Sequence, residues 1–159
     1  MKRTNCGRNS VNNVSKLVAA AALFAALPYV GALAADHKVW MKGSGSQPMR
    51  FEPAFLKIVA GDTVTFAPED AGHHAETISG PEGTEPFVGI LNRELTVTFG
   101  AEGLYAYKCP PHLKMGMVGL IQVGDAITGV DSARAAVLPD KAKSRLKALL
   151  ADAGIAVSE

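Results

Sequence analysis

Short segments in which apolar and polar residues alternate recur between residues 38 and 123, and glycine or proline residues separate many of them. Alternation with a period of two is typical of strands that bury one face. Strands this short, at this spacing, predict an antiparallel β-sandwich or barrel. The segments with this pattern are 38–41, 49–52, 55–59, 63–66, 74–78, 95–99, 104–108 and 117–123.

The residues after Asp131 follow a different pattern, in which alanine, lysine and leucine replace the β-branched residues. Pro139 and Asp140 can begin a helix, and Gly154 can end it. We expect an amphipathic helix that packs on the sandwich, because a membrane-surface helix needs larger apolar side chains on its buried face. The apolar residues at helical spacing are Ala142, Leu146, Leu149, Leu150 and Ala153.

The first 34 residues have the features of a signal peptide. An apolar run at 17–27 is followed by small residues at 32–34, which is typical of a cleavage site. We therefore expect residues 1–34 to direct export to the periplasm and to be removed after Ala34. The basic residues that precede the apolar run are Lys2, Arg3 and Arg8.

The apolar run is too short for the roughly 20 residues that span a bilayer, and Pro28 and Gly31 interrupt the sequence beyond it. We therefore expect no membrane insertion. The whole chain has a net charge of +1, and residues 35–159 carry 12 basic and 15 acidic residues. Neither the net charge of the whole chain nor that of residues 35–159 indicates a nucleic-acid partner, since no dense stripe of lysine or arginine is present.

Residues 35–159 contain one cysteine, Cys109, because Cys6 belongs to the expected signal peptide. One cysteine cannot form an internal disulfide, and an exposed free thiol is open to oxidation in an oxidising compartment. Cys109 is therefore expected either to be buried and inert or to bind a ligand.

His112 and Met117 follow Cys109 by three and eight residues. Thiolate, imidazole and thioether are soft donors that favour copper over zinc, and a trigonal site of two histidines and a cysteine with a weak axial methionine suits electron transfer. A structural zinc site would normally need four cysteine or histidine ligands. A cysteine protease would need an oxyanion hole, which the sequence does not indicate. The candidates for the second imidazole are His37, His73 and His74.

Residues 51–80 read FEPAFLKIVAGDTVTFAPEDAGHHAETISG, and residues 107–125 read YKCPPHLKMGMVGLIQVGD. These two segments resemble the pseudoazurins, which are small periplasmic blue copper proteins of cupredoxin type. The resemblance covers essentially all of 35–159. It implies a mainly β fold, with an eight-stranded Greek-key β-sandwich at 35–124. It also implies a C-terminal extension at 125–159, with two α-helices packed on the sandwich.

The resemblance implies a function as well. The protein would be a monomeric one-electron carrier in the periplasm, not an enzyme, with one type 1 copper ion. Its acceptor would be a copper nitrite reductase in denitrification, with c-type cytochromes as other redox partners. The alternative is a copper-binding or storage protein without an electron-shuttle role. The residues that match the family's copper ligands are His73, Cys109, His112 and Met117.

Other positions match residues around the copper site of the family. Met49 corresponds to a loop methionine that packs beside the exposed copper histidine. A small apolar patch around that histidine would consist of Pro111, Leu113 and Met115. Family members surround this patch with lysines, of which this chain retains Lys42, Lys108 and Lys114, whereas Ala71 and Val88 occupy positions where lysine is common. We therefore expect docking through the apolar patch, with a weak contribution from charge.

The sequence departs from the family at His74, where asparagine is usual, and at Pro110, where threonine is usual. In related proteins that asparagine binds the backbone N–H at the position of Pro110, and proline has no N–H. We expect His74 and Pro110 to form a compatible pair. The backbone N–H of His74 would still point at the sulfur of Cys109, whereas Pro111 cannot offer a second donor.

Overall fold

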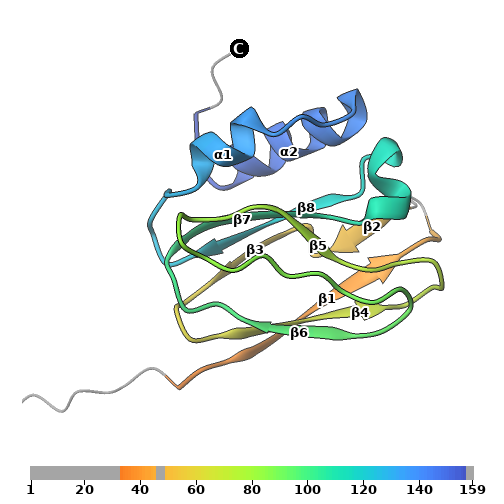
Figure 1. The fold of residues 1–159 in the computed structure, drawn as a ribbon, viewed down its shortest axis with the longest axis horizontal. Helices are drawn as coiled ribbons and strands as arrows, with labels where there is room; N and C mark the ends of the chain where they lie inside the picture. Colours follow the sequence, from red (N-terminus) through yellow and green to blue (C-terminus); the bar gives the residue numbers. More distant parts are fainter. Residues whose placement is uncertain (1–32, 46–48, 157–159) are drawn as a thin grey trace, which may run out of the picture. The chain divides into compact units, whose positions relative to one another are not determined.

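The computed structural model describes residues 33–45 and 49–156, which belong to one compact unit of the chain. Two four-stranded sheets face each other, and a helical layer covers one of them (Figure 1). This is the cupredoxin fold that the resemblance implied. Residues 1–32 of the expected signal peptide lie outside the described residues, so its prediction is not tested.

The first sheet has the strand order β2-β1-β4-β6. Its central pair, β1 and β4, is parallel, whereas β2 and β6 pair antiparallel with their neighbours. The strands span Asp36–Lys42 (β1), Arg50–Glu52 (β2), Thr63–Pro68 (β4) and Leu95–Thr98 (β6).

The second sheet has the order β3-β8-β7-β5, with β3 and β8 parallel and the other pairs antiparallel. Its strands are Phe55–Ile58 (β3), Glu76–Ser79 (β5), Gly103–Lys108 (β7) and Val118–Val123 (β8). The long pairing of β7 with β8 matters for function, because the loop that joins these two strands contains Cys109, His112 and Met117.

Each of the eight expected strand segments overlaps an observed strand, but the expected antiparallel pairing was wrong for two pairs of strands. Residue alternation shows which face of a strand is buried and carries no information about its partner. The Greek-key connections bring β1 beside β4 and β3 beside β8, and both of these pairs run parallel.

An aromatic cluster fills the space between the sheets. The ring of Tyr107 lies 4.7 Å from that of Phe51 and 5.0 Å from that of Phe66, both edge to face. Tyr107 faces Gly119 across the β7–β8 pair, and a Cβ atom at position 119 would lie 2.2 Å from the tyrosine ring. The missing side chain of Gly119 therefore makes room for the ring of Tyr107, which fills the core two residues before Cys109.

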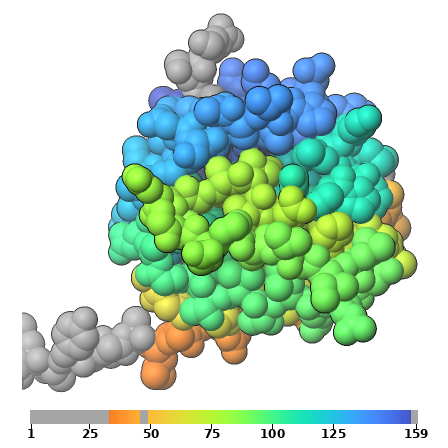
Figure 2. All heavy atoms as spheres, in the orientation of Figure 1, coloured from red at the N-terminus to blue at the C-terminus, as the bar shows by residue number. Residues whose placement is uncertain are grey.

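A second apolar cluster joins the outer face of β7 and β8 to the C-terminal helices. These are α1, Val130–Ala135, and α2, Asp140–Asp152, and they confirm the expected pair of helices. Their layer, drawn in blue, lies directly on the sandwich (Figure 2). Within the described part of the chain, no helix combines the length and apolar character needed to cross a membrane.

The packing of α2 on the sheet gives a prediction for stability. Leu150 is 2% exposed in the second apolar cluster. We expect Leu150→Ala to lower the free energy of unfolding by about 2–5 kcal/mol, since it leaves a cavity in a packed core. Chemical denaturation of the copper-loaded protein would measure the change. The exposed Lys147 on the same helix is the matched control, and Lys147→Ala is expected to change stability by less than about 0.5 kcal/mol.

Candidate metal centre

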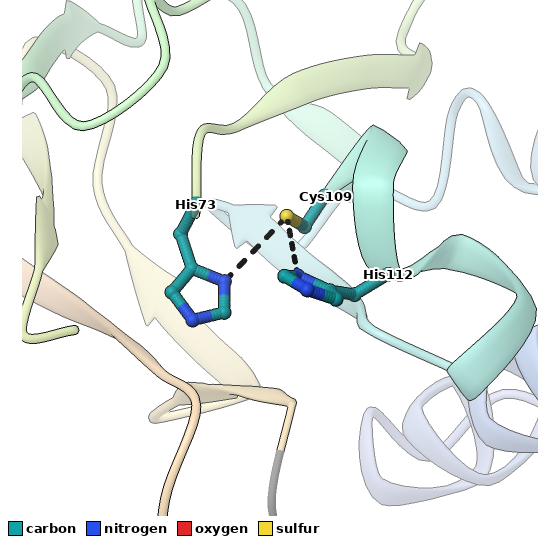
Figure 3. A group of neighbouring side chains, drawn as sticks. All are labelled: His73, Cys109 and His112. Atoms are coloured by element: carbon teal, nitrogen blue, oxygen red, sulfur yellow. Dashed lines mark hydrogen bonds between the residues drawn. The ribbon is translucent and has the colours of Figure 1, made fainter. Parts of the chain in front are cut away.

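Two imidazoles and a thiol converge at one end of the sandwich (Figure 3). The Nδ1 atom of His73 lies 3.7 Å from Sγ of Cys109, and Nδ1 of His112 lies 3.5 Å from the same sulfur. One possible ligand atom from each of the three residues lies within 4.8 Å of the others. The two rings are not stacked, with centroids 4.6 Å apart and an interplanar angle of 52°, so both Nδ1 atoms can face a shared ion.

Two loops supply these side chains. His73 lies in the loop between β4 and β5, and Cys109 follows the last residue of β7. His112 belongs to the short 3₁₀ helix η1, Pro110–Met115, which leads into β8. The loops sit at the ends of hydrogen-bonded strands in both sheets, so the donors are held in place without a metal.

Backbone hydrogen bonds close the loop from Cys109 to Met117. The N–H of Cys109 donates to the carbonyl of Met117 at 3.0 Å, and the N–H of Met117 donates to the carbonyl of His112 at 3.2 Å. Gly116 ends η1 with φ of 88°, a left-handed conformation that glycine adopts without strain. Met117 is fully buried and belongs to the same apolar cluster as Cys109. The fourth expected ligand therefore lies beside the other three.

Burial controls the protonation of the donors. It raises the pKa of the Cys109 thiol, against the lowering effect of backbone N–H groups of His74 and His112. Burial also lowers the pKa of His73, with a further lowering by His112 and an opposite effect of Asp70. His73 is thus held as a neutral imidazole, the form that binds metals. A thiolate at Cys109 needs a nearby positive charge, which a bound metal ion supplies.

The structure distinguishes the three histidines that the sequence left open. His37 lies on β1 and pairs through Nε2 with Asp62 at 2.8 Å, so it takes no part in the cluster. His74 is half-buried, and its Nδ1 atom has no hydrogen-bond partner among the described residues. Of the three candidates, His73 alone joins Cys109 and His112 in the cluster found within the described residues.

The expected hydrogen bond from the backbone of His74 to the Cys109 sulfur is present. The backbone N–H of His112 donates to the carbonyl of Cys109 at 3.1 Å, and its proximity also lowers the pKa of the thiol, an effect that sequence reasoning missed. No hydrogen bond between the side chain of His74 and residue 110 is among those found in the described residues. The energetic pairing of His74 with Pro110 stays a prediction.

Asn92 is a structural residue of the site that sequence reasoning missed. Its side-chain oxygen accepts the N–H of Gly72, and its backbone N–H donates to the carbonyl of His73 at 2.9 Å. It has φ of 61°, which asparagine tolerates better than most residues. These bonds attach the His73 loop to the segment before β6. A polar residue between the apolar Leu91 and the charged Arg93 gave no signal in the sequence.

Arg145 connects helix α2 to the site. Its guanidinium donates to the carbonyl of Gly116 at 3.1 Å and to that of Met49 at 3.4 Å. Met49 is half-buried against the apolar cluster that contains Cys109 and Met117. The C-terminal helix therefore supports the loop of the site, a contact between residues far apart in the sequence.

The three lysines expected near the site differ in their surroundings. Lys42 lies 3.1 Å from carboxylate oxygens of both Glu52 and Glu69, and Lys108 lies 3.0 Å from Glu76. Lys114 is exposed and forms no ion pair with any described residue. Two of the three charges are thus balanced by neighbouring carboxylates.

The apolar residues around His112 also differ in exposure. Met115 is 51% exposed and Pro111 is exposed, whereas Leu113 is half-buried and packs against the second apolar cluster. His112 is itself half-buried. The segment from residue 87 to 91 exposes further apolar side chains, with Val88 63% and Ile90 66% exposed.

The fold and the cluster together define a class. A β-sandwich that brings two imidazoles, a thiol and a buried methionine to one end is a cupredoxin, and this soft donor set suits copper. Residues 37–124 match the family of copper-binding proteins described as the plastocyanin/azurin family.

Similarity to individual proteins identifies a narrower family within the cupredoxins. The chain is 47% identical over 138 residues to a pseudoazurin of Paracoccus pantotrophus, and the match covers 85% of this chain and 94% of that protein. The solved structure of a pseudoazurin from Hyphomicrobium denitrificans matches with a TM-score of 0.67 and 38% identity, covering 77% of this chain and 99% of that one. A pseudoazurin structure from Methylobacterium extorquens AM1 matches with a TM-score of 0.69 and 35% identity, covering 74% and 98%.

The chain belongs to the pseudoazurins. It is therefore a copper-containing electron carrier and not an enzyme, as the resemblance in sequence implied.

The contacts of Asn92 generate a prediction. Asn92→Gly preserves the left-handed backbone but removes the acceptor for Gly72, and we expect it to lower the free energy of unfolding by about 0.5–1.5 kcal/mol. Asn92→Ala removes the same acceptor but keeps a Cβ atom at positive φ, where alanine is less tolerated than asparagine, so it should cost about 1 kcal/mol more than Asn92→Gly. Denaturant unfolding would measure both variants. Wild-type stability in both would show that Asn92 does not hold the His73 loop.

Proposed function

We propose that His73, Cys109, His112 and Met117 bind one type 1 copper ion. The observation that carries this assignment is the convergence of two Nδ1 atoms on the Cys109 sulfur, with all three donors within 4.8 Å. A trigonal arrangement of two imidazoles and a thiolate, with a weak axial thioether, is the electron-transfer copper geometry. Met117 would supply the thioether donor, because it is fully buried and its backbone carbonyl accepts the N–H of Cys109.

The bound copper ion supplies the redox chemistry, by accepting and releasing one electron. The residues of this chain keep the donors fixed during that change. The loop from Cys109 to Met117 is closed by its own backbone, and Asn92 and Arg145 hold the two ligand loops from outside. A site that does not rearrange needs little reorganisation when the charge changes, which favours rapid electron transfer. The backbone N–H groups of His74 and His112, which lower the pKa of the Cys109 thiol, would tune the potential.

His112 is the proposed route for electrons. It is half-buried, whereas His73 is fully buried. The exposed neighbours Pro111 and Met115 would contact a redox partner, with a smaller share for the half-buried Leu113. Weak electron-transfer complexes have small interfaces, so a limited apolar patch is sufficient.

The segment at 87–91 extends this apolar patch. The N–H of Gly89 donates to the carbonyl of Ala75, and Asn92 donates to His73, so this segment lies along the His73 loop. The teal copper loop and the green segment near residue 90 reach the same side of the sandwich in Figure 2. Exposed Val88 and Ile90 would therefore enlarge the contact surface, and Val88 occupies a position where lysine is common in the family.

We further propose that the protein acts in the periplasm after removal of residues 1–34. Residues 35–124 would form the copper-binding domain, and 125–159 its helical extension. The proposed partners are a copper nitrite reductase and c-type cytochromes. The family resemblance supports these partners, and the monomeric state is proposed on the same basis.

A copper storage role is the second candidate. Storage would favour a site with many methionines or histidines that binds several ions. The cluster found in the described residues contains two histidines and one cysteine, with one buried methionine beside it. This donor set suits one ion with fixed geometry, so electron transfer is the better-supported function.

The ligand assignment leads to a test by substitution. Cys109→Ser should abolish the intense visible absorption of the copper form, because the band arises from the thiolate. Met117→Leu should retain the band and shift the reduction potential, because the axial bond is long and weak. Absorption spectra and voltammetry of the copper-loaded variants would measure both effects.

The two adjacent histidines provide a matched control for this test. His73→Ala should remove copper binding, whereas His74→Ala should leave one copper per chain, since its side chain lies outside the cluster. Metal analysis after dialysis would measure the stoichiometry. Copper loss in His74→Ala with retention in His73→Ala would contradict the assignment.

The docking proposal predicts a shallow dependence of electron transfer on salt. Steered encounters slow steeply as ionic strength rises. Because Lys42 and Lys108 are paired with glutamates, we expect the rate with a nitrite reductase to fall less than about threefold between about 0.01 and 0.15 M salt. Stopped-flow kinetics would measure it, and a fall of tenfold or more would show that the lysines steer the partner.

Substitutions on the apolar patch complete this test. Ile90→Ser and Met115→Ser should slow electron transfer, because both residues are exposed beside the proposed electron route. Ile127 is similarly exposed but follows β8, at the opposite end of the sandwich from the copper loop. Ile127→Ser is therefore the control that should leave the rate unchanged.

A further inference from the structure

Asp62 is a buried carboxylate at the end of the sandwich opposite the metal centre. It lies in the turn before β4 and is 2% exposed. Its Oδ2 atom accepts the N–H of Val59 at 3.1 Å and lies 2.8 Å from Nε2 of His37. Within the described part of the chain, its one ion-pair partner is His37, which is charged only when protonated. A buried carboxylate is costly unless hydrogen bonds and an opposite charge compensate it.

The other oxygen of Asp62 faces the backbone nitrogen of Ala35. The N–H of Ala35 donates to Oδ1 at 2.8 Å. The carbonyl of Ala35 accepts the N–H of Thr63 at 2.9 Å, which continues the parallel pairing of β1 with β4. Ala35 is thus held on both sides, although it precedes the first residue of β1.

Ala35 is also the first residue after the proposed signal-peptide cleavage. Hydrolysis of the Ala34–Ala35 peptide bond by a signal peptidase consumes one water and leaves a carboxylate on Ala34 and an amine on Ala35. That amine is protonated near neutral pH, since unpaired α-amino groups have a pKa of about 7.7–8.0. The nitrogen that donates to Asp62 as a neutral amide in the precursor would carry a positive charge in the mature chain.

We propose that removal of the signal peptide places the new α-ammonium group of Ala35 on the buried carboxylate of Asp62, and so completes an ion pair that fastens the first strand of the mature protein. This inference rests on the proposed cleavage after Ala34. Asp62 also accepts the N–H of Phe99 through its backbone carbonyl at 2.9 Å. The pair therefore joins the start of β1 to the turns beside β4 and β6.

The surrounding charges favour this assignment. Asp36 on the same strand accepts a hydrogen bond from the hydroxyl of Thr63. Lys38 is paired with Glu94 and is not directed at Asp62. His37 and Asp62 are the remaining titratable groups at this position, so the α-ammonium would be the permanently available cation near neutral pH. Asp62 is 2% exposed whereas Ala35 is exposed, so solvent would screen the pair mainly from the side of the ammonium group.

In the experiment a bacterial host expresses and exports the precursor, and the processed product is isolated with copper bound. One variant has a serine inserted between positions 34 and 35, which moves the ammonium group one residue away from Asp62 and keeps every side chain of the mature protein. Asp62→Asn is made with and without this insertion. Mass spectrometry identifies the first residue of each product, and thermal unfolding is followed from pH 6.5 to pH 9.5.

We expect the unmodified mature chain to begin at Ala35 and to unfold about 2–4 °C above the insertion variant at pH 6.5. An ion pair raises the pKa of the folded ammonium, so its stabilisation is complete below the unfolded value and is lost as pH rises through the folded one. The difference should therefore shrink toward pH 9.5. Asp62→Asn should remove the difference in melting temperature between the two chains at every pH.

Equal melting temperatures at pH 6.5, or a difference that does not change with pH, would overturn the ion pair. A mature chain that begins at another residue would overturn it as well. If Asp62→Asn does not fold, the insertion variant and an NMR titration of the Ala35 methyl group still test the proposal. A pKa of the Ala35 ammonium group at or below that of an unpaired α-amino group would contradict it. The visible copper band is expected in every folded form, so its absence would indicate failure of the proposed copper site instead.

Discussion

The backbone closure of the loop between β7 and β8 is the constraint on which the metal centre depends. The hydrogen bonds of Cys109 with Met117, and of Met117 with His112, bring three of the four proposed ligands together within nine residues of sequence. The loop can be this short because its two strands are neighbours in one sheet. The strands are rigid because Tyr107, two residues before the cysteine, and its aromatic neighbours fill the core.

The fourth donor comes from the other sheet, and its position is secured by a separate set of contacts. His73 follows β4, which belongs to the first sheet, and Asn92 ties its loop to the segment before β6. Arg145 of α2 holds the opposite side of the centre through the carbonyl of Gly116. The metal centre is thus supported by both sheets and by the helical layer, and burial keeps His73 neutral.

Each end of the sandwich contains a buried acidic group. At the metal centre, the thiol of Cys109 has a raised pKa from burial, and a bound cation would stabilise its thiolate. At the other end, hydrogen bonds from Ala35, His37 and Val59 hold the pKa of Asp62 below its usual range. In both places N–H donors compensate the buried acid in part, and the proposed copper ion and the proposed α-ammonium group of Ala35 would each add a positive charge.

The strand segments, the C-terminal helix and the donors of the copper loop could be predicted from the sequence, because they depend on residues close together in the chain. Period-two alternation and the Cys-His-Met spacing carry that local information. The parallel pairing of β1 with β4 is visible only in the three-dimensional structure. Residue spacing alone left His37, His73 and His74 open; the family resemblance pointed to His73, and in the structure His73 lies beside Cys109. The structure also revealed the roles of Asn92 and Arg145, whose partners lie between 19 and 96 residues away. Contacts between distant segments depend on how the strands are ordered in space, and a residue pattern along the chain does not encode that order.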